Sequence, residues 1–297
     1  MAVNAASGRE IRRLARFGLT TNNAIDLAAF YESAFGFRRL MSARLGGADF
    51  ERLMDVQGGA LGITLGLGED VVDLVQFDRA GRPYPIGTSS SDLIFQHFAI
   101  VVADMDRAYR RLSSVAGWSA ISSAGPRRLP ETSGGVAAFK FRDPEGHPLE
   151  LLAFPPDRTP RRWRNGPGGN LYLGIDHSAI SVADTRRSVA FYLGLGLQVS
   201  ARSLNRGPEQ ARLDGLLNPR VEVTALSPSR ATPHVELLCY GPTAANRGAA
   251  PQGNDVAATR LTFEMSARSR AEADGIAEQA LTDPDGHHLI IVNSLSG

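Results

Sequence analysis

The sequence predicts an α+β fold built from tandem repeats of a single unit, a strand followed by a helix and further strands. The first observation is a near-copy within the chain: residues 95–104, FQHFAIVVAD, recur as residues 175–184, IDHSAISVAD. In each copy a histidine, His97 or His177, opens an apolar strand. An aspartate, Asp104 or Asp184, follows seven residues later, where a side-chain N-cap would start a helix.

The second observation is a nearly constant period. Strand openings at Arg16, His97, His177 and Arg260 lie 81, 80 and 83 residues apart. Such a spacing indicates an internal repeat. We therefore expect four modules, at about 16–80, 95–155, 174–241 and 258–295.

The expected helices follow the strand openings in order. Each is indicated by apolar residues three or four positions apart, which places them on one helical face. In the first module these residues are Leu27, Phe30, Tyr31 and Ala34, in the second Ala108, Leu112 and Val115, and in the third Val189 and Phe191. In the fourth module a short helix is expected near Arg270 to Ala273.

A tight turn closes the second and fourth modules. It reads DPEGH at residues 143–147 and DPDGH at residues 283–287, and Asp-Pro followed by Gly is typical of such turns. We expect His147 and His287 to pack within these turns. The fourth module has only 23 residues from Arg260 to its turn, against 46 from His97, so we expect it to have lost strand material.

One glutamate interrupts each of two apolar strands, at Glu150 in PLELLAF and at Glu236 in HVELL. A glutamate on an alternating strand often faces solvent. These runs are apolar on both sides, however, and a buried carboxylate needs a partner or a metal. We therefore expect a metal site, and we interpret His234 and His288 as structural residues.

Length and composition exclude several classes. The chain of 297 residues is long enough for two domains, expected at 1–157 and 172–297 with an exposed Pro/Gly/Arg-rich linker at 158–171. The net charge of +1 gives no reason to expect nucleic acid or membrane partners. No stretch is apolar enough for a signal peptide or a membrane span, and the single cysteine, Cys239, excludes an internal disulfide. We expect a cytoplasmic protein that binds a small molecule.

The repeated module, with histidine on its first strand, glutamate on its last and the Asp-Pro-x-Gly-His turns, resembles the vicinal oxygen chelate superfamily. That superfamily includes glyoxalase I, methylmalonyl-CoA epimerase, extradiol dioxygenases and bleomycin- and fosfomycin-resistance proteins. The resemblance implies βαβββ modules that pair into two cup-shaped half-barrel sheets with helices outside. It also implies that each cup takes its ligands from the first and last strands of its two modules.

The ligand positions decide what each cup would contain. In chain order they hold Arg16 and Asp73, His97 and Glu150, His177 and Glu236, and Arg260 and Ile290. If modules pair in sequence order, each cup holds one His/Glu pair beside an arginine. If the second module pairs with the third and the first with the fourth, one cup holds all four metal-binding residues. We expect the latter, because a cation needs three or more converging ligands.

The resemblance implies a divalent ion (Fe, Zn, Ni, Mn or Co) bound by His97, Glu150, His177 and Glu236. Such an ion would stabilise an enolate or enediolate of a substrate with neighbouring oxygens, with Glu150 or Glu236 as the catalytic base, in a lyase or isomerase.

Two alternatives stay open. One is an extradiol Fe(II) dioxygenase, which uses two histidines and one glutamate. The other is a metal-free binding protein of the drug-resistance type, in which Arg16 and Arg260 would hold the ligand. We expect the Arg16/Arg260 cup to be degenerate and structural, with its arginines in a salt bridge to Asp73. The chain is expected to be a monomer or a homodimer.

Overall fold

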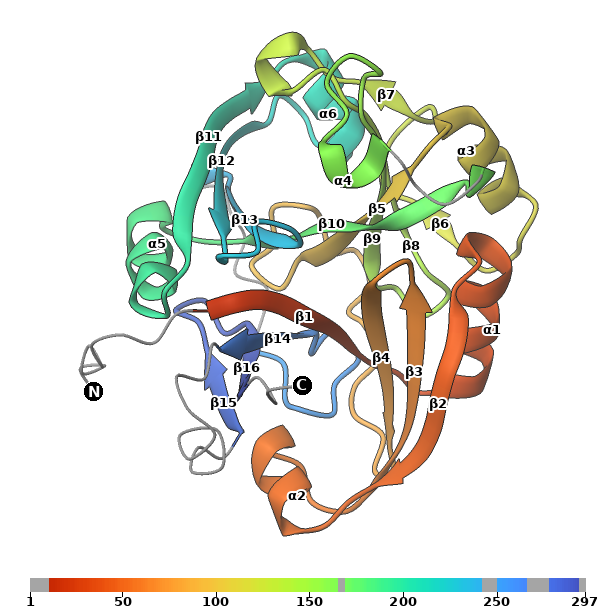
Figure 1. Ribbon diagram of the computed structural model, residues 1–297, viewed down its shortest axis with the longest axis vertical. Coiled ribbons are helices and arrows are strands. Elements are labelled where there is room, and N and C mark those ends of the chain that lie inside the picture. Colours follow the sequence, from red (N-terminus) through yellow and green to blue (C-terminus); the bar gives the residue numbers. More distant parts are fainter. Residues whose placement is uncertain (1–10, 165–168, 242–249, 266–277, 294–297) are drawn as a thin grey trace.

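The computed structural model describes residues 11–164, 169–241, 250–265 and 278–293, which form two mixed sheets with helices around them (Figure 1). The helix expected near Arg270 to Ala273 lies outside the described residues. The architecture is α+β, with each sheet curved like half a barrel, as the sequence predicts.

The first and fourth modules build the first sheet, called sheet A, in the order β15-β16-β14-β1-β4-β3-β2. Its centre is the antiparallel pair of β1 and β14. Its strands are β1 (Ile11–Thr20), β2 (Arg38–Leu45), β3 (Ala60–Leu67), β4 (Asp70–Phe77), β14 (Arg260–Met265), β15 (Gln279–Thr282) and β16 (His288–Asn293).

The second and third modules build the other sheet, sheet B, in the order β11-β12-β13-β10-β5-β9-β8-β6, with β7 on β8. Its strands are β5 (Gln96–Val102), β6 (Ser119–Ala120), β7 (Arg127–Arg128), β8 (Ala137–Arg142), β9 (Pro148–Ala153), β10 (Tyr172–Ser181), β11 (Gln198–Arg206), β12 (Arg220–Ser227) and β13 (His234–Cys239). The predicted module pairing is therefore confirmed. Each sheet joins modules from both predicted halves of the chain, whose boundaries stay a prediction.

The helices predicted for the first three modules begin where the sequence indicates. Asp104 and Asp184 accept hydrogen bonds from backbone N–H groups of the first turns that follow them, and Asn23 does the same in the first module. The helices are α1 (Ala24–Phe35), α2 (Ala48–Met54), α3 (Met105–Ser113), α4 (Arg161–Arg164), α5 (Thr185–Gly194) and α6 (Pro208–Asp214), with a 3₁₀ turn at Glu131–Ser133. Of these, α2, α4 and α6 are not predicted from the sequence.

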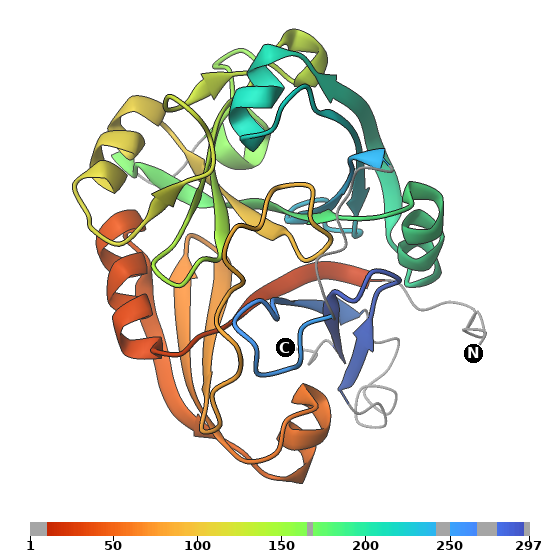
Figure 2. The same cartoon turned by 180° about the vertical axis from the view of Figure 1, so that it is seen from behind.

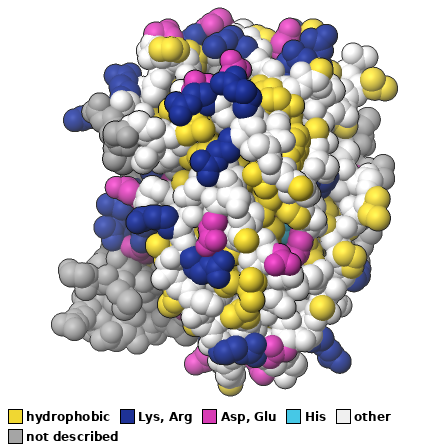
Figure 3. Space-filling view, turned by 90° about the vertical axis from the view of Figure 1, so that its right-hand side faces the viewer, with side chains coloured by type: hydrophobic (Ala, Val, Ile, Leu, Met, Phe, Trp, Pro, Cys, Tyr) yellow, Lys and Arg dark blue, Asp and Glu magenta, His cyan; other side chains and the backbone are white. Residues whose placement is uncertain are grey.

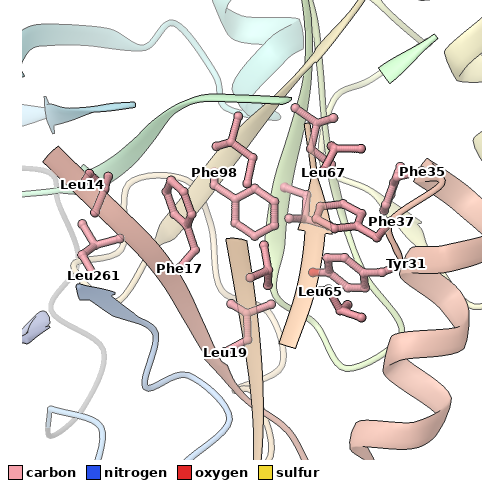
Figure 4. Packing of buried hydrophobic residues seen from close by; sticks show 14 of the residues in the cluster. Leu14, Phe17, Leu19, Tyr31, Phe35, Phe37, Leu65, Leu67, Phe98 and Leu261 are labelled. Atoms are coloured by element: carbon pink, nitrogen blue, oxygen red, sulfur yellow. The ribbon is translucent and has the colours of Figure 1, made fainter. Parts of the chain in front are cut away.

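The two sheets pack against each other through one face each. Phe17 of β1 and Phe98 of β5 are buried, and their ring centroids lie 5.5 Å apart (Figure 4). Tyr31 and Phe35 of α1 extend this core. Because successive side chains on a strand point to opposite faces, the neighbours of these phenylalanines face away from the core. Arg16 and His97 are therefore directed toward the cups.

The Asp-Pro-x-Gly-His turns join each even module to the preceding odd one. His147 lies 2.8 Å from Asp143 through Nδ1 and 2.9 Å from the carbonyl of Thr20 through Nε2, and Tyr31 donates to Asp143. Tyr192 of the third module donates in the same way to Asp283, in the turn of the fourth module. The turn packing predicted for these histidines is confirmed for His147, and His287 lies 3.1 Å from the carbonyl of Ser181.

Two connecting segments are packed onto the body of the protein. Residues 78–95 run along the back of the molecule beside residues 250–258, where Arg82 pairs with Asp255 (Figure 2). In the linker predicted after the second module most described residues are exposed, as expected, but Trp163 is buried and Arg162 pairs with the buried Asp70. The indole of Trp163 donates to Asp176, which explains why this one described residue of the linker is buried.

The described surface agrees with the balanced composition. On the face shown in Figure 3, Lys and Arg side chains are interspersed with Asp and Glu, and hydrophobic groups lie between them. None of the helices in the described ranges is long and apolar enough to cross a membrane.

Candidate metal site

The register of sheet B brings the predicted ligands to one face. In the antiparallel pair of β5 and β10, His97 lies opposite Ala179. In the flanking parallel ladders, Glu150 lies beside Ala99 and Glu236 beside Ala179. Residues two apart on a strand share a face, so both histidines and both glutamates point into the cup of sheet B.

Three of these side chains converge closely. Nε2 of His97 lies 2.8 Å from Oε2 of Glu150, and Nε2 of His177 lies 3.7 Å from the same oxygen. One ligand atom from each of the three residues lies within 4.8 Å of the other two. Two ligand atoms bound at about 2.1 Å and at a right angle would lie about 3 Å apart, so this spacing suits a single ion. All three residues are buried.

Glu236, the fourth predicted ligand, lies at the open side of this group. Its Oε2 is 3.7 Å from Nε2 of His177, and a quarter of its side chain remains exposed. On its other side, Nε2 of His234 lies 3.6 Å from Oε1 of Glu236. Glu236 is therefore beside the candidate centre and accessible from outside it. The role of all four residues as metal ligands stays a prediction.

Asp176 supports His177 from behind. Its Oδ2 lies 3.1 Å from Nδ1 of His177, and its other oxygen accepts a hydrogen bond from the indole of Trp163. A carboxylate at the second ring nitrogen orients a histidine and makes its free nitrogen a better ligand. Asp176 and His234 also form a second candidate ligand group with His177.

The ionised carboxylates of the site favour a bound cation. Burial alone would raise the pKa of Glu150, but His177 and His97 hold it well below its ordinary value. Burial is likewise outweighed at Glu236, where His177 and His234 lower the pKa to about 2. Both carboxylates are therefore ionised at neutral pH.

The two histidines differ in protonation. Burial lowers the pKa of His97, in spite of Glu150 beside it. At His177 burial is outweighed by Glu236, Asp176 and Glu150, which together raise the pKa well above its usual value. The neutral form of His97 can bind a metal directly. At His177 a cation would take the place of a proton that the surrounding carboxylates otherwise attract.

Helix α6 covers one end of the cup of sheet B. Its residue Leu213 packs on Ala99, Ala138 and Leu152 of the cup floor. Asp214 forms a buried ion pair of 2.8 Å with Lys140, which stands opposite Glu150 on the neighbouring strand. Gln210 and Tyr240 donate to the other oxygen of Asp214, at 2.7 and 3.0 Å.

One serine of the second module and one of the connecting segment 78–95 hold the last turn of α6. Ser122 donates to the carbonyl of Leu213 at 2.8 Å, and Ser90 donates to that of Asp214 at 3.0 Å. Helix C-termini leave carbonyl groups without partners, and these hydroxyls supply them. The helix is thereby attached to both modules that form the cup.

In sheet A the equivalent positions hold different residues. Arg16 lies opposite Thr262, two positions beyond Arg260, just as His97 lies opposite Ala179, two beyond His177. Asp73 lies beside Gly18, as Glu150 lies beside Ala99, and Ile290 lies beside Thr262, as Glu236 lies beside Ala179. This register agrees with the four ligand positions expected for these modules.

The expected salt bridge in sheet A forms for one arginine only. Nη1 of Arg16 lies 3.1 Å from both oxygens of Asp73. The guanidinium of Arg260 instead donates to the hydroxyl of Thr20 and to the carbonyls of Ala258 and Gly253.

Three neighbours of the site are missed by reasoning from the sequence. His234 is interpreted there as structural, although its position two residues before Glu236 on the same strand implies a shared face. Asp176 directly precedes His177 and carries no motif of its own. Asp214 belongs to a short helix that has no sequence signal of closing a cup. His288, also interpreted as structural, lies 3.2 Å from the carbonyl of Pro251 through Nε2, away from the histidines of sheet B.

Comparisons with known proteins agree with this architecture. Residues 13–151 match the model of the Glyoxalase/Bleomycin resistance protein/Dioxygenase superfamily. No curated protein sequence matches the chain.

Solved structures resemble the chain over nearly its whole length. Glyoxalase I of Zea mays is 17% identical with a TM-score of 0.57, over 95% of this chain and 92% of that one. A candidate dioxygenase from Bacillus subtilis is 11% identical with a TM-score of 0.60, over 98% of this chain and 87% of that one. At these identities the likeness establishes the fold alone.

Proposed function

We propose that the protein, of which residues 13–151 match the model of the Glyoxalase/Bleomycin resistance protein/Dioxygenase superfamily, is a divalent-metal-dependent enzyme with its active site in the cup of sheet B. The observation that carries this proposal is the convergence of His97, Glu150 and His177 within 4.8 Å. The substrate is a small molecule with neighbouring oxygens, and the reaction is an isomerisation or a lysis.

The donor set fits a divalent ion of the Fe, Zn, Ni, Mn or Co type. Imidazole nitrogens and carboxylate oxygens are the ligands that these ions share. His97 and His177 would hold the ion together with Glu150, and Asp176 would fix the ring of His177. An ion bound there would act as a Lewis acid for the negative charge that develops on substrate oxygens.

Glu236 is the proposed catalytic base. It is the more accessible of the two glutamates, and it is ionised at neutral pH, so an exposed carboxylate oxygen is free to accept a proton. Proton removal next to a carbonyl requires such a carboxylate within hydrogen-bond reach of the substrate. His234 beside it would stabilise the charged form. Glu150, which is hydrogen-bonded to His97, serves as a metal ligand in this scheme. The reverse assignment, with Glu150 as base and Glu236 as ligand, is the alternative.

A second candidate function rests on the same three residues. Two histidines and one carboxylate with open positions form the set that non-haem Fe(II) enzymes use for O₂ chemistry. The converging group here consists of His97, His177 and Glu150, with Glu236 at its edge. An extradiol-type ring-cleaving dioxygenase is therefore the alternative.

The test is elemental analysis of the purified full chain beside two variants. We expect about one divalent ion per chain, lost in His97→Ala because two of the three converging ligands hold a metal poorly. The matched control is Arg16→Met, at the equivalent position of sheet A, which keeps the ion. A protein that takes up no metal, even after reconstitution, would contradict the proposal and favour a metal-free binding protein.

The variant Glu236→Gln separates the two reactions. In an isomerase or lyase it keeps the ion and loses turnover, because the base is gone. In a dioxygenase with three ligands it keeps iron and still consumes O₂ with a catechol. Location in the cytoplasm and a monomeric or homodimeric state complete the proposal.

A further inference from the structure

The cup of sheet A contains an open cavity, whereas α6 covers the corresponding end of the cup of sheet B. A cavity of about 730 Å³ lies over its concave face, within the range that binds small organic ligands. Apolar side chains, four arginines and three carboxylates line it, and Arg12 and Arg13 pair with the lining carboxylate Glu264. The other lining groups used below are Arg16, Arg260, Asp73, Met41, Leu45 and Ile290.

The floor of this cup carries smaller residues than the floor of the other. Gly18 and Gly62 stand where sheet B carries Ala99 and Ala138, and Thr64 stands in the place of Lys140. Leu45 packs over Gly62 and Arg260 packs over Gly18, so these two side chains form the lining there. The helix that could fill the cup is α2, and none of its residues is buried. The concave face of sheet A is therefore uncovered by α2, whereas α6 packs over one end of the cup of sheet B through Leu213 and Asp214.

The polar groups of the cavity favour an anion. Arg16 is fixed to Asp73 through Nη1 alone, and Thr64 donates to the same carboxylate at 2.7 Å. The Nε and Nη2 atoms of Arg16 have no partner among the described residues, and 45% of its side chain is exposed. An arginine held in place with donors to spare is suited to a carboxylate, phosphate or sulfonate.

Arg260 adds a positive charge that has no carboxylate partner among the described residues. It is buried, and within the described ranges its partners are a hydroxyl, two carbonyls and the ring of Phe77. A buried cation without a carboxylate partner produces a positive potential in the low-dielectric space beside it.

We propose that the cup of sheet A is a second, metal-free binding site that takes a small amphipathic anion. Arg16 binds the acidic group, and the apolar body lies against Met41, Leu45 and Ile290. This site is independent of the catalysis proposed for sheet B, and its ligand needs no neighbouring oxygens for a metal.

The probe is 8-anilino-1-naphthalenesulfonate, whose fluorescence rises when its rings enter an apolar site. Its neutral counterpart, N-phenyl-1-naphthylamine, has the same rings without the sulfonate. We expect one saturable site for the anion and weaker binding of the neutral compound. In Arg16→Met the affinity for the anion should fall by about ten- to a hundredfold, with the neutral compound unaffected.

Matched variants locate the effect. Arg202→Met removes an exposed arginine from β11 of the other sheet and should leave binding unchanged. Met41 lines the cavity and is 54% exposed, so the fold should tolerate either a glutamate or a lysine at this position. Met41→Glu should weaken and Met41→Lys should strengthen binding of the anion by a few fold. This pair also tests the site if Arg16→Met fails to fold.

The proposal is overturned if wild type shows no saturable site, if the anion binds no more tightly than the neutral compound, or if neither Arg16→Met nor the Met41 pair changes its affinity. The metal content of Arg16→Met should match that of wild type. Loss of metal from His97→Ala with intact anion binding would show that the two sites are separate.

Discussion

The two cups share one strand register and differ in what stands on it. Sheet B has His97, Glu150 and His177 at three ligand positions, where sheet A has Arg16, Asp73 and Arg260. The backbone thus specifies where four side chains converge, and the side chains give the two cups different charges. On our proposals, sheet B would hold a metal ion and sheet A an anion.

The helices over the cups show the same contrast. Both α2 and α6 have seven residues and follow a glycine with φ of +95°, which a residue with a side chain rarely adopts. Position for position, Phe50 and Met54 of α2 correspond to Gln210 and Asp214 of α6. Gln210 and Asp214 are buried and hydrogen-bonded, whereas α2 has no buried residue. Two polar anchors therefore hold α6 on the cup, in addition to the buried Leu213, at a position where both helices have a leucine.

Lys140→Met should give the largest loss of stability. It leaves the buried carboxylate of Asp214 without its cation, which costs about 3–5 kcal/mol of unfolding free energy. Urea unfolding measures this loss. The matched control is Arg44→Met in the first module, which breaks an exposed pair with Asp78 and should cost less than about 1 kcal/mol.

The double variant Lys140→Met/Asp214→Leu separates charge from packing. If the unpaired carboxylate causes the loss, the double variant recovers most of it. A double variant as unstable as Lys140→Met would show that lost packing of the lysine stem is the cause.

Truncation of the leucine shared by the two helices should have an intermediate effect. Leu213→Ala removes a buried side chain from the floor of the closed cup and should cost about 2–4 kcal/mol. Leu53→Ala, at the equivalent position beside the open cavity, should cost less than half as much. Thermal unfolding of both variants compares them, and equal losses would contradict the assignment of α2 as an open helix.

A smaller effect is the dependence of stability on pH that arises from His288, a neighbour of Arg260. Burial, together with Arg260, lowers the pKa of His288 to about 4. The folded state therefore resists protonation, so His288 reduces stability as the pH falls from its unfolded pKa of about 6.5 to about 4. Above that window it has no such effect.

The variant His288→Gln keeps a donor for the carbonyl of Pro251 and does not titrate. Across this pH window it should lose less stability than wild type, by on the order of 1 kcal/mol, in urea titrations at each pH. Identical pH profiles for the two proteins would show that His288 titrates normally.

The sequence predicts the frame of the site well. Modules, helix starts and the pairing of the second module with the third follow from short-range patterns and from ligand chemistry. The placement of Lys140 could not be predicted, because a strand residue faces the cup only in one register. The closure by α6 depends on Gln210 and Asp214 reaching Tyr240 and Lys140, contacts that no local pattern encodes.

The exposure of the glutamates also depends on packing. The sequence predicts that both are buried, and Glu150 is, whereas Glu236 stays partly accessible. Sheet B covers one end of its own cup with α6 and leaves the side of β13 less covered. Local hydrophobicity identifies the strand correctly but does not show which end of it lies at the entrance.

The nested order of the modules has a consequence for synthesis. Modules two and three adjoin in the chain, so sheet B can close once they have left the ribosome. Strand β1 pairs with β14, and one of its edges has to wait until nearly the whole chain has been made. Contacts so distant in sequence form slowly, and an unpaired strand edge invites association with other chains. The cup of sheet B can therefore be complete in the nascent protein before the cup of sheet A has formed.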